Sequence, residues 1–152
     1  AFMSGDEAGS TDEWEGWDVM YGGWPQFGDL LAWAYVAGPS AVADPSASVV
    51  PGEAAYSNLS IATIGLNCNI DNKVFPKLSY SELRFDEDNN AAVYGITDDD
   101  FGNYYQLSAK YQYSKMLSFS AYYAILQPGD AIEAVRGNDD AQEFFWEANV
   151  RF

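Results

Sequence analysis

Residues 143–152 read EFFWEANVRF, and this stretch decides the fold class. Every second side chain is apolar, and the members of this set are Phe144, Trp146, Ala148, Val150 and Phe152. The other parity is polar except at Phe145, and it holds Glu143, Phe145, Glu147, Asn149 and Arg151. Successive side chains of a β-strand point to opposite faces, so the alternation predicts a strand with one apolar and one wet face.

The same two-residue period recurs in four earlier segments, at residues 58–70, 73–86, 103–113 and 116–126. Two short turns, Asp71-Asn72 and Ser114-Lys115, would join these segments into two hairpins. The alternation slips at residues 82–85, which suggests a bulge or a strand end, so the facing of Glu82 and Arg84 is left open. Residues 1–3 could be the end of a sixth strand.

The composition narrows the function classes. The 152 residues carry a net charge of −16, 16% aromatic side chains, no His and one Cys. Lys and Arg number seven, too few for a chain that neutralises phosphates, so nucleic acid is excluded as a partner. Without His, and with Cys68 alone, the usual general base and metal ligands are missing, so we expect no enzyme, no metal and no cofactor. Glu143 and Glu147 share a strand face but would lie ~13 Å apart, too far for a glycosidase pair.

The aromatic residues come without long apolar runs, none approaching the ~20 residues of a transmembrane helix. A transmembrane β-barrel needs only every second residue to be apolar, with aromatic girdles at both interfaces, although a sugar-binding β-sandwich has a comparable composition. The expected connections alternate between the two short turns and long segments at 85–102, 127–142 and about 4–57, and most of the acidic residues lie in the long ones. Long loops outside and short turns inside are the outer-membrane arrangement.

We therefore predict an all-β fold, an antiparallel transmembrane β-barrel segment of about five to six C-terminal strands. Residues 1–152 would form one outer-membrane barrel domain, in which 1–57 are mostly a long extracellular loop and 58–152 are strands and loops. Five strands cannot close, because single-chain bacterial barrels need at least ~8 and an open edge in lipid leaves backbone groups unpaired. The sheet would therefore be part of a larger barrel, or its edge strands would pair with strands that are supplied from elsewhere.

The alternation also assigns faces. The expected lumen-facing side chains are Lys77, Lys110, Gln106, Gln112, Ser118, Ser120, Tyr122, Glu143, Glu147, Asn149 and Arg151. The aromatic terminus, with Trp146, Val150 and Phe152, resembles the C-terminal signal that the barrel assembly machinery recognises.

A loop motif carries a family resemblance. Ser4-Gly5-Asp6-Glu7 precedes residues 16–30, GWDVMYGGWPQFGDL, in which Trp17, Asp18, Trp24, Pro25 and Gln26 form the distinctive core. This stretch, followed by a segment like 56–70 and an aromatic last strand, resembles the C-terminal portion of the alginate-export family of outer-membrane proteins. The resemblance implies a barrel of about 18 strands that passes a polysaccharide or another solute. This chain departs from the family in two ways. Gly23 stands where relatives often have an arginine. The positive and negative side chains assigned to the lumen are nearly equal in number, whereas a channel for a polyuronate should have a basic lumen.

The predicted function is a passive, porin-like conduit of the alginate-export type in the outer membrane of a Gram-negative bacterium. Its partners would be outer-membrane lipid, the assembly machinery and a polysaccharide or small solute. Two rivals stay open: a general porin that prefers cations, drawn by acidic loops, and a secreted carbohydrate-binding β-sandwich. The acidic clusters at 86–90 and 98–100 could bind Ca²⁺, which takes carboxylate and amide oxygens as ligands. Neither cluster has the spacing of an EF-hand loop, so we interpret both as solvated loop residues.

Overall fold

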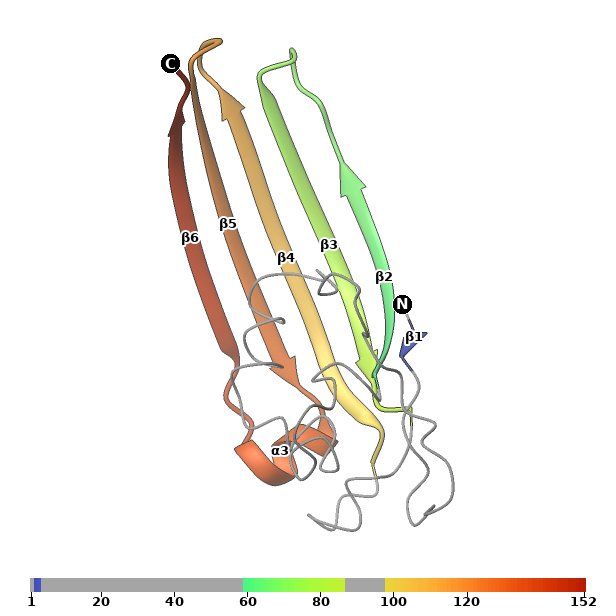
Figure 1. Cartoon of the computed structure of the whole chain (residues 1–152). Coiled ribbons are helices and arrows are strands. Elements are labelled where there is room, and N and C mark those ends of the chain that lie inside the picture. The colour runs from blue at the N-terminus through green and yellow to red at the C-terminus, as the bar shows by residue number, and fades with distance from the viewer. Residues whose placement is uncertain (1, 4–58, 87–97) are drawn as a thin grey trace, which may run out of the picture.

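One antiparallel sheet with the strand order β1-β2-β3-β4-β5-β6 organises the structure, a computed structural model that describes residues 2–3, 59–86 and 98–152 (Figure 1). The strands are β1 (Phe2–Met3), β2 (Leu59–Asn67), β3 (Val74–Arg84), β4 (Asp100–Gln112), β5 (Leu117–Pro128) and β6 (Ala141–Val150). Each strand pairs with the next one along the chain. The antiparallel all-β prediction is confirmed. Across the described ranges the sheet stays open and does not close into a barrel.

The two kinds of connection lie at opposite ends of the sheet. The turns after β2 and β4 lie at one end together with the C-terminus, and we call this the turn end (Figure 1). The end of β3, the start of β4 and the connection after β5 lie at the other end, which we call the loop end (Figure 1). Strand β4 begins at Asp100, inside the segment expected to be a loop up to Gly102. The alternation of short and long connections is otherwise as predicted.

A short helix, α3 (Asp130–Arg136), lies within the connection expected to be a loop over 127–142. Asp130 and Glu133 occupy its first turn, where negative side chains interact favourably with the helix dipole. Gly137 ends it with φ of 86°, and the Gly137 amide donates to the Glu133 carbonyl. The two-residue alternation could not reveal this helix, because about two turns give too little helical periodicity.

The turn between β2 and β3 has the predicted centre. Asp71 and Asn72 both adopt positive φ, 52° and 53°, a conformation that favours Asn, Asp and Gly and matches the twist of a hairpin. Asn69 supports the turn from its side chain, because its Oδ1 accepts the Asn72 amide at 3.0 Å and its Nδ2 donates to the Asn72 side chain at 2.9 Å.

The slip in the alternation near residue 83 corresponds to a register shift. Leu83 pairs with Gly102 but Arg84 pairs with Asp100, so Phe101 is an extra residue on β4. Of the two alternatives, a bulge and a strand end, both occur at this level of the sheet: β3 ends at Arg84, and the extra residue of the bulge belongs to the neighbouring strand β4.

The register separates the side chains into two faces. On the first, which we call the apolar face, large apolar side chains are exposed along every strand from β2 to β6. They are Ile64, Leu66, Leu78, Tyr80, Tyr105, Leu107, Tyr111, Phe119, Tyr123, Phe144, Trp146 and Val150. Ile64 is 73% and Trp146 65% exposed, so neither side chain belongs to a buried core.

The opposite face, which we call the polar face, has two parts. Toward the turn end it carries hydroxyl, amide and charged groups. Toward the loop end it becomes the core, where the buried apolar side chains include Leu59, Ile61, Leu83, Phe85, Phe101 and Leu126. The rings of Phe85 and Phe101 meet edge to face at 5.3 Å. The two faces thus exchange polarity at the loop end, where the apolar face ends in Glu82, Asn103 and Gln127.

Candidate functional site: the polar face of the sheet

All the side chains predicted to face a lumen lie on the polar face. One row across the sheet joins Lys77, Ser108, Tyr122 and Phe145 through paired positions on β3, β4, β5 and β6. The next row toward the turn end holds Phe75, Lys110, Ser120 and Glu147, and the one after it holds Gln112, Ser118 and Asn149. The row on the loop side holds Ser79, Gln106, Ala124 and Glu143. Arg151 continues the ladder beyond β6, since its amide donates to the Met116 carbonyl at 2.9 Å.

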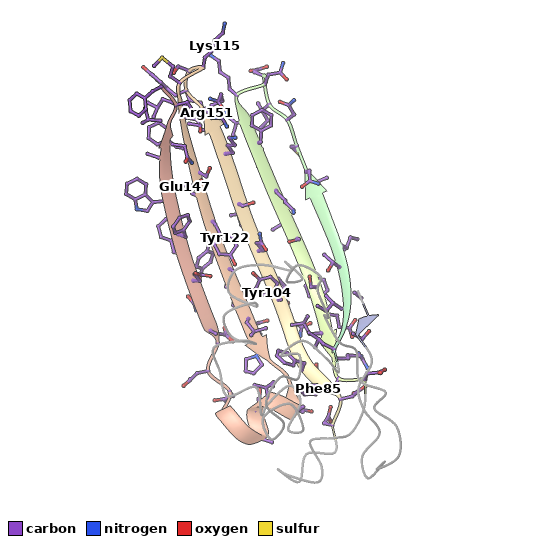
Figure 2. All side chains as sticks on the ribbon, viewed as in Figure 1. Phe85, Tyr104, Lys115, Tyr122, Glu147 and Arg151 are labelled. Atoms are coloured by element: carbon purple, nitrogen blue, oxygen red, sulfur yellow. The ribbon has the colours of Figure 1, made fainter. Side chains whose placement is uncertain are left out.

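Two tyrosines mark the middle of this face, as Figure 2 shows. Tyr104 and Tyr122 are buried, and their hydroxyl oxygens lie 2.7 Å apart in a hydrogen bond. The Tyr104 hydroxyl is also 3.4 Å from the Gln106 Oε1. A further polar contact joins the hydroxyls of Thr63 and Ser81 at 2.8 Å. The buried hydroxyls of Tyr104 and Tyr122 satisfy each other, which holds this face in a defined shape.

A hollow of about 490 Å³ lies on the polar face between these tyrosines and the turn end. Lys77 and Lys110 line it, together with the hydroxyl-bearing Ser108 and Ser120 and the aromatic Phe75, Tyr122 and Phe145. The alternation predicted the facing of the lysines and serines. It could not predict the hollow, because the neighbours across strands depend on the register.

The two acidic residues of β6 differ in their surroundings. Glu147 accepts a hydrogen bond from the Asn149 side-chain amide at 2.7 Å and is exposed. Glu143 is partly buried, and in the described part of the chain its Oε2 has no hydrogen-bond partner and no contact with solvent.

Glu82 and Arg84, whose facing the sequence left open, lie on the other face at the loop end. Their side chains form an ion pair of 2.7 Å, and Arg84 also lies 3.5 Å from the Asp99 carboxylate. The hydrogen bond and the charge of Glu82 raise the pKa of the exposed Arg84 guanidinium. Asp100 lies beside them beyond the apolar face, and burial, reinforced by Asp98, raises the pKa of its carboxyl.

Tyrosine pairs mark both ends of the apolar face, and Tyr123, Phe144 and Trp146 lie in the rows between these ends. At the loop end the rings of Tyr80 and Tyr105 lie 5.2 Å apart. The hydroxyls of Tyr80 and Tyr123 donate to Asn103 at 2.6 Å and to Gln142 at 2.9 Å. At the turn end the rings of Tyr111 and Tyr113 meet at 6.4 Å. Of the terminal residues predicted to form an assembly signal, Trp146 and Val150 are exposed on this face and Phe152 is exposed beyond β6.

The loop motif with Trp17, Asp18, Trp24, Pro25 and Gln26 lies outside the described residues. Within residues 59–86 and 98–152, no three potential ligands among Asp, Glu and Cys gather as a metal site. The only described helix is far shorter and more polar than a membrane-spanning one.

Comparisons with protein-family models, with curated proteins and with solved structures gave no match.

Proposed function

We propose that the sheet is part of the wall of an outer-membrane β-barrel channel, with the apolar face against lipid and the polar face against the solute path. The single observation that supports this most is the exposure of the apolar face along all five long strands. Five strands spaced about 4.8 Å and about 27 Å of strand length give a projected area on the order of 600 Å². Soluble monomers seldom expose one apolar patch beyond this size.

The dimensions and edges of the apolar face suit a bilayer. From Tyr105 in β4 to Tyr113 just after it, an extended chain rises about 27 Å, and a tilt of about 40° reduces this to roughly 21 Å, close to the ~25 Å apolar band of outer-membrane barrels. The tyrosine hydroxyls at the loop end hydrogen bond to amides at the polar margin. An amphipathic ring with a wet hydroxyl and an apolar body is the typical residue of the lipid–water interface.

The unpaired edges of the sheet require further strands in this proposal. β6 pairs only with β5 in the described chain, and β1 covers only Leu59 and Ser60 of β2. Hydrocarbon does not tolerate unpaired backbone groups, so strands of the same protein or of other copies would complete the wall. The loop motif, and with it the likeness to alginate-export proteins, makes a solute conduit of that type the proposed activity. The barrel assembly machinery would be its folding partner and the bacterial outer membrane its location.

The lipid-facing assignment is tested by tryptophan fluorescence in vesicles that contain brominated acyl chains. The difference between the parent and Trp146→Phe isolates the signal of Trp146. We expect brominated lipid to quench this signal and aqueous acrylamide to leave it largely unchanged, because the indole faces hydrocarbon.

The double variant Phe145→Trp with Trp146→Phe is the matched control, since it moves the indole one residue onto the polar face. Its quenching should be reversed, strong with acrylamide and weak with brominated lipid. Equal quenching at the two positions, or a chain that stays soluble without detergent and ignores vesicles, would favour the β-sandwich alternative.

The conduit itself is tested by conductance of planar bilayers that contain the full chain. We expect stepwise conductance with little preference between K⁺ and Cl⁻, because Lys77, Lys110 and Arg151 on the polar face oppose Glu143 and Glu147. Reversal potentials under a KCl gradient measure the preference. A strong preference for K⁺ would support the cation-selective porin, and the lack of any conductance would contradict the conduit.

A further inference from the structure

We propose that the hollow on the polar face binds an amphiphilic organic anion, a carboxylate carried on an aromatic or alicyclic ring. This names a solute class for the polar face and to that extent rests on the proposed function. The starting observation is Phe145, which breaks the alternation of β6 and leaves an aromatic ring 49% exposed among polar side chains. Phe75 is the second such exception, 36% exposed on the same face. Both rings line the hollow.

The hollow is an open depression in the polar face whose volume suits a small molecule. Its volume of about 490 Å³ lies within the roughly 300–1,000 Å³ usual for ligand pockets. Tyr122 pairs with Phe145 across β5 and β6, and both residues line the hollow. Phe75 lies three strands away from Phe145, about 14 Å across the sheet. An apolar ring of the solute would lie against these walls.

The charge of the hollow selects an anion. Lys110 pairs with Phe75, two residues from Lys77, so the lysines are diagonal neighbours with their Cβ atoms about 7–8 Å apart. In the described ranges the ion pairs join Arg84 to acidic side chains, and neither Lys77 nor Lys110 forms an ion pair. From this Cβ spacing the two flexible side chains can both reach one carboxylate, which would form a charge-assisted hydrogen bond with each ammonium group. The serine hydroxyls of Ser108 and Ser120 lie beside the lysines as further donors.

The surrounding charge supports the same conclusion despite the net charge of −16. Lys73, Lys115 and Arg151 lie toward the turn end, beyond the hollow, as Figure 2 shows for Lys115 and Arg151. The nearest acid along the row is Glu147, two strands from Lys110 and engaged by Asn149. The mostly apolar walls set the expected ligand apart from a polyuronate, whose sugar rings carry hydroxyls on every side.

The test is ¹⁹F NMR titration of 4-fluorobenzoate into the full chain in detergent micelles, with protein-free micelles as the blank. We expect saturable binding of 4-fluorobenzoate and at least ~10-fold weaker binding of 4-fluorobenzyl alcohol, which keeps the ring and lacks the charge. Glucuronate, which keeps the charge and lacks the apolar body, should compete poorly. Equal binding of the alcohol, equal competition by glucuronate, or no saturable binding would each overturn the proposal.

Variants locate the site. Lys77→Gln with Lys110→Gln should weaken binding of 4-fluorobenzoate ~10-fold or more, and Phe145→Ser roughly two- to tenfold. Lys73→Gln with Lys115→Gln removes the same charge from the two turns and should leave the affinity unchanged. An equal loss in the turn variant would mean that net charge alone attracts the anion, and would overturn the site. The titration needs no lipid or ion flux, so its outcome is independent of the tryptophan and conductance tests.

Discussion

Replacing Leu107 with arginine is expected to destabilise the chain in lipid vesicles by about 2–4 kcal/mol, the cost of a cationic side chain near the bilayer midplane of a barrel. Leu107 lies in the middle of the apolar face, in one row with Leu78 and Tyr123. It is 51% exposed, so the substitution creates no cavity and no steric conflict within the sheet. The free energy of unfolding in vesicles, measured with guanidinium chloride, gives the size of the effect.

The matched control is Gln106→Arg, which puts the same side chain one residue away on the polar face. It should change the free energy of unfolding by about 1 kcal/mol, the usual size for a lost hydrogen bond, because Gln106 is half-buried and its Oε1 lies 3.4 Å from the Tyr104 hydroxyl. If Leu107→Arg were as mild as this control, the apolar face would be in contact with water, and the membrane proposal would fail. The comparison isolates the environment of the two faces, because the introduced residue is the same and the two positions are adjacent on one strand.

The alternation in the sequence was sufficient to predict the strands, their antiparallel hairpins and the facing of the polar residues. Phe144 and Glu147 could be assigned to opposite faces because parity is a local property of β6. The Asp71-Asn72 turn was equally local, since the residue types themselves tolerate positive φ.

What the sequence could not supply were the relations between strands. The hollow depends on Lys77 pairing with Ser108 and Phe75 with Lys110, and those pairings join segments far apart in the chain. In the sequence Phe145 is only an exception to the alternation of β6, because its place in the lining of the hollow depends on residues of other strands. The helix α3 was missed because about two turns give too little helical periodicity. The early start of β4 was missed because it lies at the loop end, where the polarity of the faces is exchanged and alternation between apolar and polar residues no longer indicates the exposed face.

Gly102 makes the extra residue on β4 possible, and Gly102→Ala is expected to destabilise the chain by about 3 kcal/mol or more. Its φ of 135° is a conformation that side-chain-bearing residues rarely adopt. A Cβ at this position would also collide with the carbonyl oxygen of Gln127 and lie 2.8 Å from the amide nitrogen of Gly129. The neighbouring atoms are backbone of β5 and its following turn, so they cannot move aside as a flexible side chain would.

Alanine substitutions at two further glycines distinguish the two causes of the expected loss of stability, the positive φ and the steric collision of the Cβ. Gly137 has φ of 86° and ψ of 179°, and a methyl group there would meet nothing within 4 Å, so Gly137→Ala should cost about 1–3 kcal/mol, from the backbone conformation alone. At Gly129, the N-cap of α3, a Cβ would collide with the Asp100 carbonyl without a positive φ, so Gly129→Ala reports mainly the steric cost, with a smaller loss of helix capping. Chemical denaturation of the three variants in one detergent measures all these costs. If Gly102→Ala were no worse than Gly137→Ala, the close approach of β4 to β5 at this bulge would be wrong, and with it the register that places Tyr104 opposite Leu126 and the lysines at the hollow.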